Sequence, residues 1–151
     1  GRLDRESEGL LLMTNDGEFA NALTHPSMHV PKTYRVTIHP SLSKEQRAAL
    51  ENGVEIDGKM TLPSEVRVVS REEGRVVIEL TIFEGRNRQI RKMCESLGLE
   101  VARLKRIKIG SVKLGMLKTG DYRYLTPDEV HALMTSAEQS GNLRRGLNDK
   151  I

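Results

Sequence analysis

Cysteine and aromatic residues are scarce in this sequence, and each scarcity excludes a class of protein. A single cysteine, Cys94, cannot form an internal disulfide, and no Cys/His cluster has the spacing of a zinc site. With no Trp, two Phe and three Tyr, the chain lacks the repeated aromatic platforms of proteins that stack many single-stranded bases. The longest apolar run, Leu10–Met13, is far shorter than the roughly 20 residues of a membrane span. No charged-then-apolar leader opens the chain. Together these features lead us to expect a metal-free, non-membrane protein of a reducing compartment.

Positive charge is concentrated in one stretch of the 151 residues. From Arg86 to Lys118 ten basic residues face two acidic ones, a net charge of +8, whereas the remainder nets −5. Clustered Lys and Arg favour a polyanionic partner, because they release counterions from phosphates. Nucleic acid is the favoured polyanion, since the stretch lacks the bulky apolar anchors of a membrane-surface helix. The alternative is a solvated basic face with no partner.

Turn and capping signals divide the first half of the chain. An apolar run over 9–14 predicts a buried strand, followed by a helix capped by Asn15 or Asp16 that buries Phe19, Ala20 and Leu23 and stops before Pro26. The alternating residues 32–39 predict a second strand. The capping box over 43–46 predicts a helix to about Asn52 that stops at Gly53.

The second half alternates strands with helices. Residues 65–70 and 75–82 predict a hairpin, and Ile90, Met93, Cys94 and Leu97 recur at helical spacing. A strand is expected over 101–109, followed by short strands over 113–117 and 122–125 and by a helix begun by the capping box over 126–129. Beyond Thr135 the chain turns polar, and we expect a frayed helix or a disordered tail. The order predicts an α+β fold around an antiparallel or mixed sheet of about one domain's length.

Three groups of residues are candidates for chemistry. Asp4 beside Arg2 precedes an apolar run and is either a nucleophile or base at a sheet edge, or a loop residue that caps amides. The arginines over 86–91 crowd a helix start, which is unfavourable unless a phosphate, a buried carboxylate or both neutralise them. The alternative is an ordinary surface helix with long polar side chains. Tyr34 is either a half-buried sheet residue or a face offered to a base. The histidines form no triad pattern, and glycine-rich phosphate loops are absent.

Four segments in order, GRLDRESEGLLLMTNDGEFAN (1–21), KTYRV (32–36), EGRNRQIRKMCESLG (84–98) and RLKRIKIG (103–110), resemble one family. They are similar to the RsuA/RluB/RluE/RluF group of ribosomal RNA pseudouridine synthases, most closely to the large-subunit RluB type. The resemblance runs from residue 1 to about 134. It implies a pseudouridine synthase catalytic domain over 1–134, with a polar tail over 135–151.

The resemblance assigns roles to the motif residues. Asp4 would be the catalytic aspartate that attacks the uridine, and Arg2 would help to extrude the nucleotide. Tyr34 would stack on the uracil ring, and Arg91 would form an ion pair with Asp4. A carboxylate in an enclosed pocket tends to take up a proton, and an adjacent guanidinium keeps it ionised.

Further residues would line the pocket or contact RNA. Ile90 and Leu104 would be pocket walls, and Lys32 belongs to the same motif as the stacking tyrosine. The charge of the basic stretch adds contacts to the RNA backbone from Arg86, Arg88, Arg103 and Arg106.

The resemblance also implies an isomerase that needs no cofactor, with ribosomal RNA of the large subunit as its partner, acting as a monomer in a bacterial cytoplasm. Relatives of this family carry a basic RNA-binding domain and opening strands before the first motif, so we expect an N-terminally truncated chain. The competing hypothesis is a non-catalytic fragment that binds ribosomal RNA.

Overall fold

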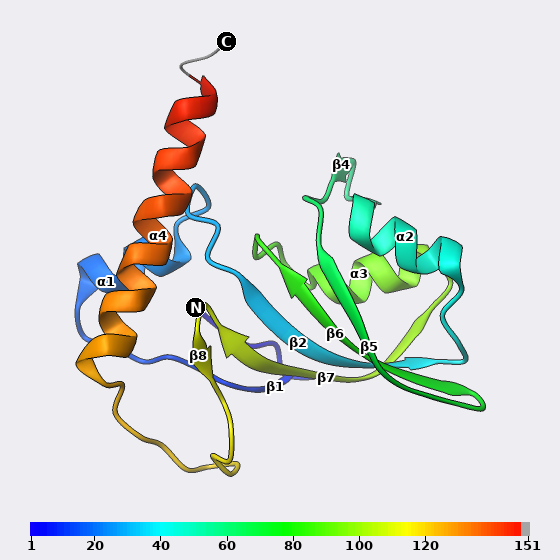
Figure 1. Ribbon diagram of the computed structural model, residues 1–151. Coiled ribbons are helices and arrows are strands. Elements are labelled where there is room, and N and C mark those ends of the chain that lie inside the picture. Colours follow the sequence, from blue (N-terminus) through cyan, green and yellow to red (C-terminus); the bar gives the residue numbers. More distant parts are fainter. Residues whose placement is uncertain (149–151) are drawn as a thin grey trace.

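The computed structural model describes the backbone of residues 1–148 and the side chains of residues 1–138. One mixed sheet lies at the centre, with helices packed on it at two places (Figure 1). In chain order the elements are β1 (Glu8–Gly9), α1 (Gly17–Thr24), β2 (Lys32–His39), α2 (Lys44–Asn52), β3 (Glu55–Ile56), β4 (Lys59–Met60), β5 (Glu65–Glu72), β6 (Arg75–Ile82), α3 (Gln89–Ser96), β7 (Glu100–Ile109), β8 (Val112–Lys113) and α4 (Pro127–Asn148).

The sheet has the order β1-β7-β2-β6-β5, with β8 paired to β7. All neighbours are antiparallel except β1 and β7, which are parallel. The predicted α+β class with a largely antiparallel sheet is therefore confirmed. The strand β2 was predicted from its alternating, β-branched residues, and the hairpin β5–β6 from two strand-like runs on either side of a glycine-containing loop.

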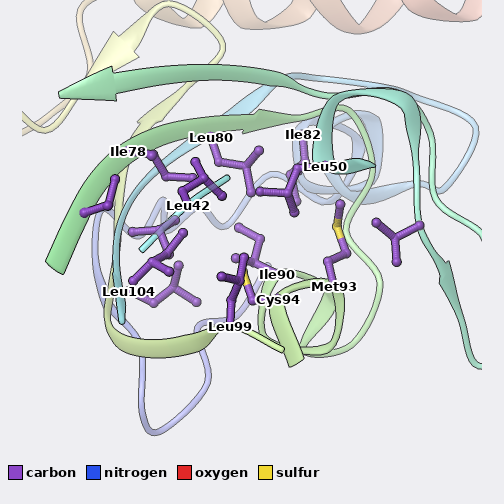
Figure 2. Close-up of a cluster of buried hydrophobic side chains, with 14 of the residues drawn as sticks. Leu42, Leu50, Ile78, Leu80, Ile82, Ile90, Met93, Cys94, Leu99 and Leu104 are labelled. Atoms are coloured by element: carbon purple, nitrogen blue, oxygen red, sulfur yellow. The ribbon is translucent and has the colours of Figure 1, made fainter. Parts of the chain in front are cut away.

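The larger core lies between the sheet and the helices α2 and α3. In Figure 2 the α3 side chains Ile90, Met93 and Cys94 face Ile78 and Leu80 from the sheet, and all of them are buried. The spacing that predicted α3 is thus the spacing of its buried face. Both caps of α2 are as predicted, since the box between Ser43 and Gln46 is present and Gly53 ends the helix.

A second buried cluster joins α1 to α4, which lie side by side in Figure 1. Phe19 and Leu23 pack there with Leu133 and Ala137 of α4. Asp16 is the N-cap of α1, accepting hydrogen bonds from the backbone of residues 18 and 19. Both amide-to-side-chain hydrogen bonds of the capping box at the start of α4 are present as well.

Two of the expectations differ from the structure. The strand over 9–14 is wrong beyond Gly9: the chain leaves the sheet after Leu10, and Met13 is 89% exposed. The short strands over 113–117 and 122–125 are replaced by β8, because Val112 and Lys113 are the residues of this region that pair with β7. Beyond Thr135, where a frayed helix or a disordered tail was expected, α4 continues to Asn148 and Ala137 is buried; residues 149–151 lie outside the described residues.

No helix among the described residues is long and apolar enough to cross a membrane.

Candidate active site

A cavity of about 730 Å³ opens where the N-terminal segment, the start of β2, the segment before α3 and the middle of β7 meet. Of the residues proposed from the sequence, it brings together Arg2, Asp4, Lys32, Tyr34, Arg86, Arg88, Ile90, Leu104 and Arg106. Arg91 and Arg103 are not among the residues that line it. Six Lys and Arg side chains line the cavity against two carboxylates, Asp4 and Glu84, so it is strongly positive.

The parallel pairing of β1 with β7 places the N-terminal segment beside the cavity. Gly9 pairs with Arg106, and the amide of Leu10 donates to the Arg106 carbonyl at 2.8 Å. The strands approach so closely that a Cβ on Gly9 would lie 2.2 Å from that carbonyl oxygen, and its φ of 115° also favours glycine. A glycine at this position therefore allows the segment that carries Asp4 to lie against β7.

Asp4 occupies a tight turn at the cavity wall and is partly exposed. Its carbonyl accepts the Ser7 amide at 3.0 Å, which fixes the turn. Among the residues with described side chains, the Asp4 carboxylate has no hydrogen-bond or ion-pair partner. Asp4 nevertheless affects Arg88: Glu6 raises the pKa of that guanidinium, and Asp4 makes a smaller contribution in the same direction.

The predicted ion pair between Asp4 and Arg91 is not formed in this structure; Glu6 takes that place. Arg91 donates from a terminal nitrogen to the Glu6 carbonyl at 2.8 Å, and its Nε lies 3.8 Å from the Glu6 carboxylate. Arg88 binds the same carboxylate at 2.9 Å. Arg88, followed by Arg91, lowers the pKa of Glu6.

The carboxylate at the arginine-rich start of α3 is Glu6 from the N-terminal segment. Its side chain is 60% exposed, so it is not the buried carboxylate expected as one alternative. Arg88 caps the helix in the left-handed region, with a φ of 51°, and no side chain caps the first turn. Sequence analysis did not single out Glu6, since more than 80 residues separate it from its partners. Its only signal in the sequence is its position two residues after Asp4, in a chain whose basic residues need carboxylates as counter-charges.

Two of the expected RNA-contacting arginines are committed to protein contacts. Arg86 donates to the carbonyls of Lys59 and Ile56, which ties the β3–β4 hairpin to the cavity rim. Arg103 forms an ion pair with Glu8 outside the cavity. Glu8, like Glu6, was not anticipated as a partner.

The walls near β2 combine apolar side chains with cations. Ile90 and Leu104 are buried, and Tyr34 is half-buried opposite Arg106 in the β2–β7 pair. Arg106 is only 5% exposed, and its Nε donates to the Leu10 carbonyl at 2.8 Å. Burial, with a smaller contribution from Arg106, lowers the pKa of Lys32. An apolar wall with one aromatic ring and fixed cations suits a planar base attached to a charged backbone.

No group of three or more His, Cys, Asp or Glu side chains with the arrangement of a metal site occurs in the described part of the chain.

Fold and cavity together define a mixed α+β protein with a positively charged cleft that holds one unpartnered carboxylate. The chain belongs to the RNA pseudouridylate synthase family, whose sequence profile matches residues 1–96. The resemblance found in the sequence motifs is thereby confirmed.

Individual relatives agree with this assignment. The chain is 44% identical over 144 residues to the ribosomal large subunit pseudouridine synthase B of Bacillus subtilis (strain 168), covering 94% of this chain and 59% of that protein. It is 44% identical over 135 residues to the RNA pseudouridine synthase YtzG of the same organism, covering 88% and 56%. A crystal structure of a pseudouridylate synthase superposes with a TM-score of 0.81 at 37% identity, covering 88% and 57%. The chain thus spans somewhat more than half the length of the proteins it matches.

Proposed function

We propose that this protein converts a uridine in ribosomal RNA into pseudouridine, with Asp4 as the catalytic aspartate. The observation that carries the proposal is the unpartnered Asp4 carboxylate at the wall of a basic cavity that also contains Tyr34. Membership of the RNA pseudouridylate synthase family supports the reaction class.

The reaction is an isomerisation. The bond between ribose C1′ and uracil N1 breaks, the base turns over, and C1′ bonds to C5; the C5 hydrogen leaves as a proton, and N1 ends up carrying one. The Asp4 carboxylate assists by adding to the sugar or the base, or by taking a proton, and each of these roles requires it to be ionised.

Tyr34 and the apolar wall hold the detached base while it turns. Ile90 and Leu104 exclude water from one side, and the aromatic ring offers a face for stacking. A base in folded RNA must first leave its stack, at a cost of a few kcal/mol, which phosphate contacts from Arg2 and the basic stretch offset.

Arg91 remains the proposed partner of Asp4. Its Nε is buried without a hydrogen-bond partner in this structure, so this nitrogen is available to a carboxylate that moves toward it. In this proposal Glu6 holds Arg91 in the unliganded protein, and closure around RNA brings Asp4 to it.

Large-subunit RNA is the proposed substrate, supported by the name of the similar Bacillus protein. We further propose that residues 1–134 form the catalytic domain, that the protein acts as a cytoplasmic monomer, and that the chemistry uses no cofactor.

The test is Asp4→Asn, assayed for pseudouridine in ribosomal RNA by pseudouridine-specific labelling and for RNA binding by titration. We expect loss of product with binding retained; Asp16→Asn, an exposed aspartate at a helix cap, is the control. The assay compares the 151-residue chain with a chain extended upstream of residue 1. Product formed at the wild-type rate by Asp4→Asn refutes the catalytic role. RNA binding without product by the 151-residue chain, with product formed by the extended chain, favours the non-catalytic binding fragment.

A further inference from the structure

Lys32 and Arg106 lie together on the cavity side of the sheet and are called here the β2–β7 cation pair. Arg106 is opposite Tyr34 in the β2–β7 register, and Lys32 precedes Tyr34 by two residues, which places both Lys32 and Tyr34 on one face. Both cations line the cavity. Lys32 Nζ also lies beside Gly85, where an added Cβ would be 3.5 Å away.

The β2–β7 cation pair has no anion of its own. The single side-chain hydrogen bond of Arg106 uses Nε, which leaves both terminal nitrogens of a 5%-exposed guanidinium without a partner among the described residues. Within the same part of the chain, Lys32 Nζ has neither a hydrogen-bond nor an ion-pair partner. Two cations held close together and partly out of water destabilise each other, and this is relieved when an anion binds between them.

Two other cations of the cavity already have carboxylate partners within the protein. Arg88 binds Glu6 at 2.9 Å, and Arg86 lies 3.9 Å from Glu84 while donating to backbone carbonyls. The β2–β7 cation pair therefore differs from them in being both buried by the fold and unmatched by a carboxylate.

We propose that the β2–β7 cation pair binds the phosphate group of the nucleotide whose base lies against Tyr34. This inference rests on the proposed function, since it takes Tyr34 as the surface that receives the base. The terminal nitrogens of a guanidinium match two phosphate oxygens, and an ammonium supplies a compact third donor. The ligand recognised at this end of the cavity is thus a nucleotide and not a nucleoside.

The test is a titration of the ¹⁵N-labelled 151-residue chain with uridine 5′-monophosphate, uridine and inorganic phosphate, followed through the amide signals of β2 and β7. We expect the monophosphate to bind at least about tenfold more tightly than uridine, and inorganic phosphate to shift the same signals. Lys32→Gln should remove the preference while leaving the affinity for uridine unchanged. Lys108→Gln, a β7 lysine that lines a different cavity, should retain it.

Equal affinities for the monophosphate and uridine overturn the proposal, as does a loss in Lys108→Gln as large as that in Lys32→Gln. Should Lys32→Gln lose its dispersed spectrum, Lys32→Arg keeps the charge and must keep the preference. Repeating the titration with Asp4→Asn separates the two proposals. If Asp4→Asn keeps the preference for the monophosphate and still makes pseudouridine, only the role of Asp4 is refuted. If the wild-type protein makes pseudouridine but does not prefer the monophosphate, only the phosphate site is refuted.

Discussion

At the residue scale, Glu6 is the side chain that ties the Asp4 turn to α3. Its carbonyl and its carboxylate bind Arg91 and Arg88, respectively, so one residue fixes both the backbone and the charge next to Asp4. Since the pair with Arg88 is exposed to solvent, it adds little to global stability. Its importance therefore lies in placing Asp4.

Replacing Glu6 with Ala should lower kcat for pseudouridine formation about tenfold, because a small misplacement of a reacting group is costly. KM and the free energy of unfolding should change little. Glu6→Gln keeps a hydrogen-bond acceptor for Arg88 and should recover part of kcat. Single-turnover and steady-state kinetics check this, with Glu73→Ala in the exposed β5–β6 turn as the control. If Glu6→Ala behaves like the control, Glu6 does not position Asp4.

Cys94 should be unreactive in the folded protein. Burial raises the pKa of its thiol from 9.0 to about 12, so the reactive thiolate is scarce at pH 8. Because the folded state holds the thiol proton more tightly, this group's contribution to stability is fully present below pH 9 and is lost as the pH rises toward about 12. Alkylation by iodoacetamide at pH 8 should follow the unfolding transition in urea. Rapid alkylation without denaturant contradicts a buried Cys94.

At the element scale, local signals predicted the elements they act on, and long-range contacts decided the rest. The capping boxes at Ser43 and Thr126 act within four residues, so the sequence alone located both helix starts. The apolar run over 9–14 was misleading because a strand needs a neighbour along its length, and of the N-terminal segment Glu8 and Gly9 are the residues that pair with β7.

The candidate active site shows the same difference between local signals and long-range contacts. Most of the side chains that the motifs singled out line the cavity, because their residue types carry the chemistry. The pairing of arginines with Glu6 and Glu8 could not be predicted, since exposed carboxylates occur throughout the chain and only the β1–β7 contact brings these two to their partners.

Gly9→Ala should separate β1 from β7. An added Cβ would collide with the Arg106 carbonyl at 2.2 Å, and alanine is strained at a φ of 115°. We expect a loss of about 2 kcal/mol or more in the free energy of unfolding, measured by urea titration, together with reduced activity. Gly17→Ala is the matched control, because its Cβ meets nothing within 4 Å and should leave stability unchanged or slightly higher. Equal stability of the two variants contradicts the close approach.

At the scale of the whole molecule, part of the basic stretch is neutralised by carboxylates from the N-terminal segment, whereas the cavity keeps cations that have no carboxylate partner. Four cavity-lining cations have no ion-pair partner among the described residues: Arg2, Lys32, Lys59 and Arg106.

These four cations set an expected salt dependence. Each phosphate contact to single-stranded RNA contributes about −0.7 to the slope of log K against log salt, so a uridine-containing oligonucleotide should show a slope of about −3. Arg2→Gln should make the slope shallower by about 0.7, whereas Lys108→Gln should not change it. Fluorescence anisotropy over 50–300 mM salt, about the range in which such contacts weaken, provides the measurement. A slope near zero contradicts an electrostatic cleft.

The central claim is that Asp4 acts in the exchange in which ribose C1′ leaves uracil N1 and bonds to C5. Release of tritium from ribosomal RNA labelled at uridine C5 reports that exchange directly, because forming the new bond expels the C5 hydrogen. We predict steady release by the wild-type protein and by Asp16→Asn, and release at the no-enzyme background by Asp4→Asn. Release by Asp4→Asn at the wild-type rate would contradict the account.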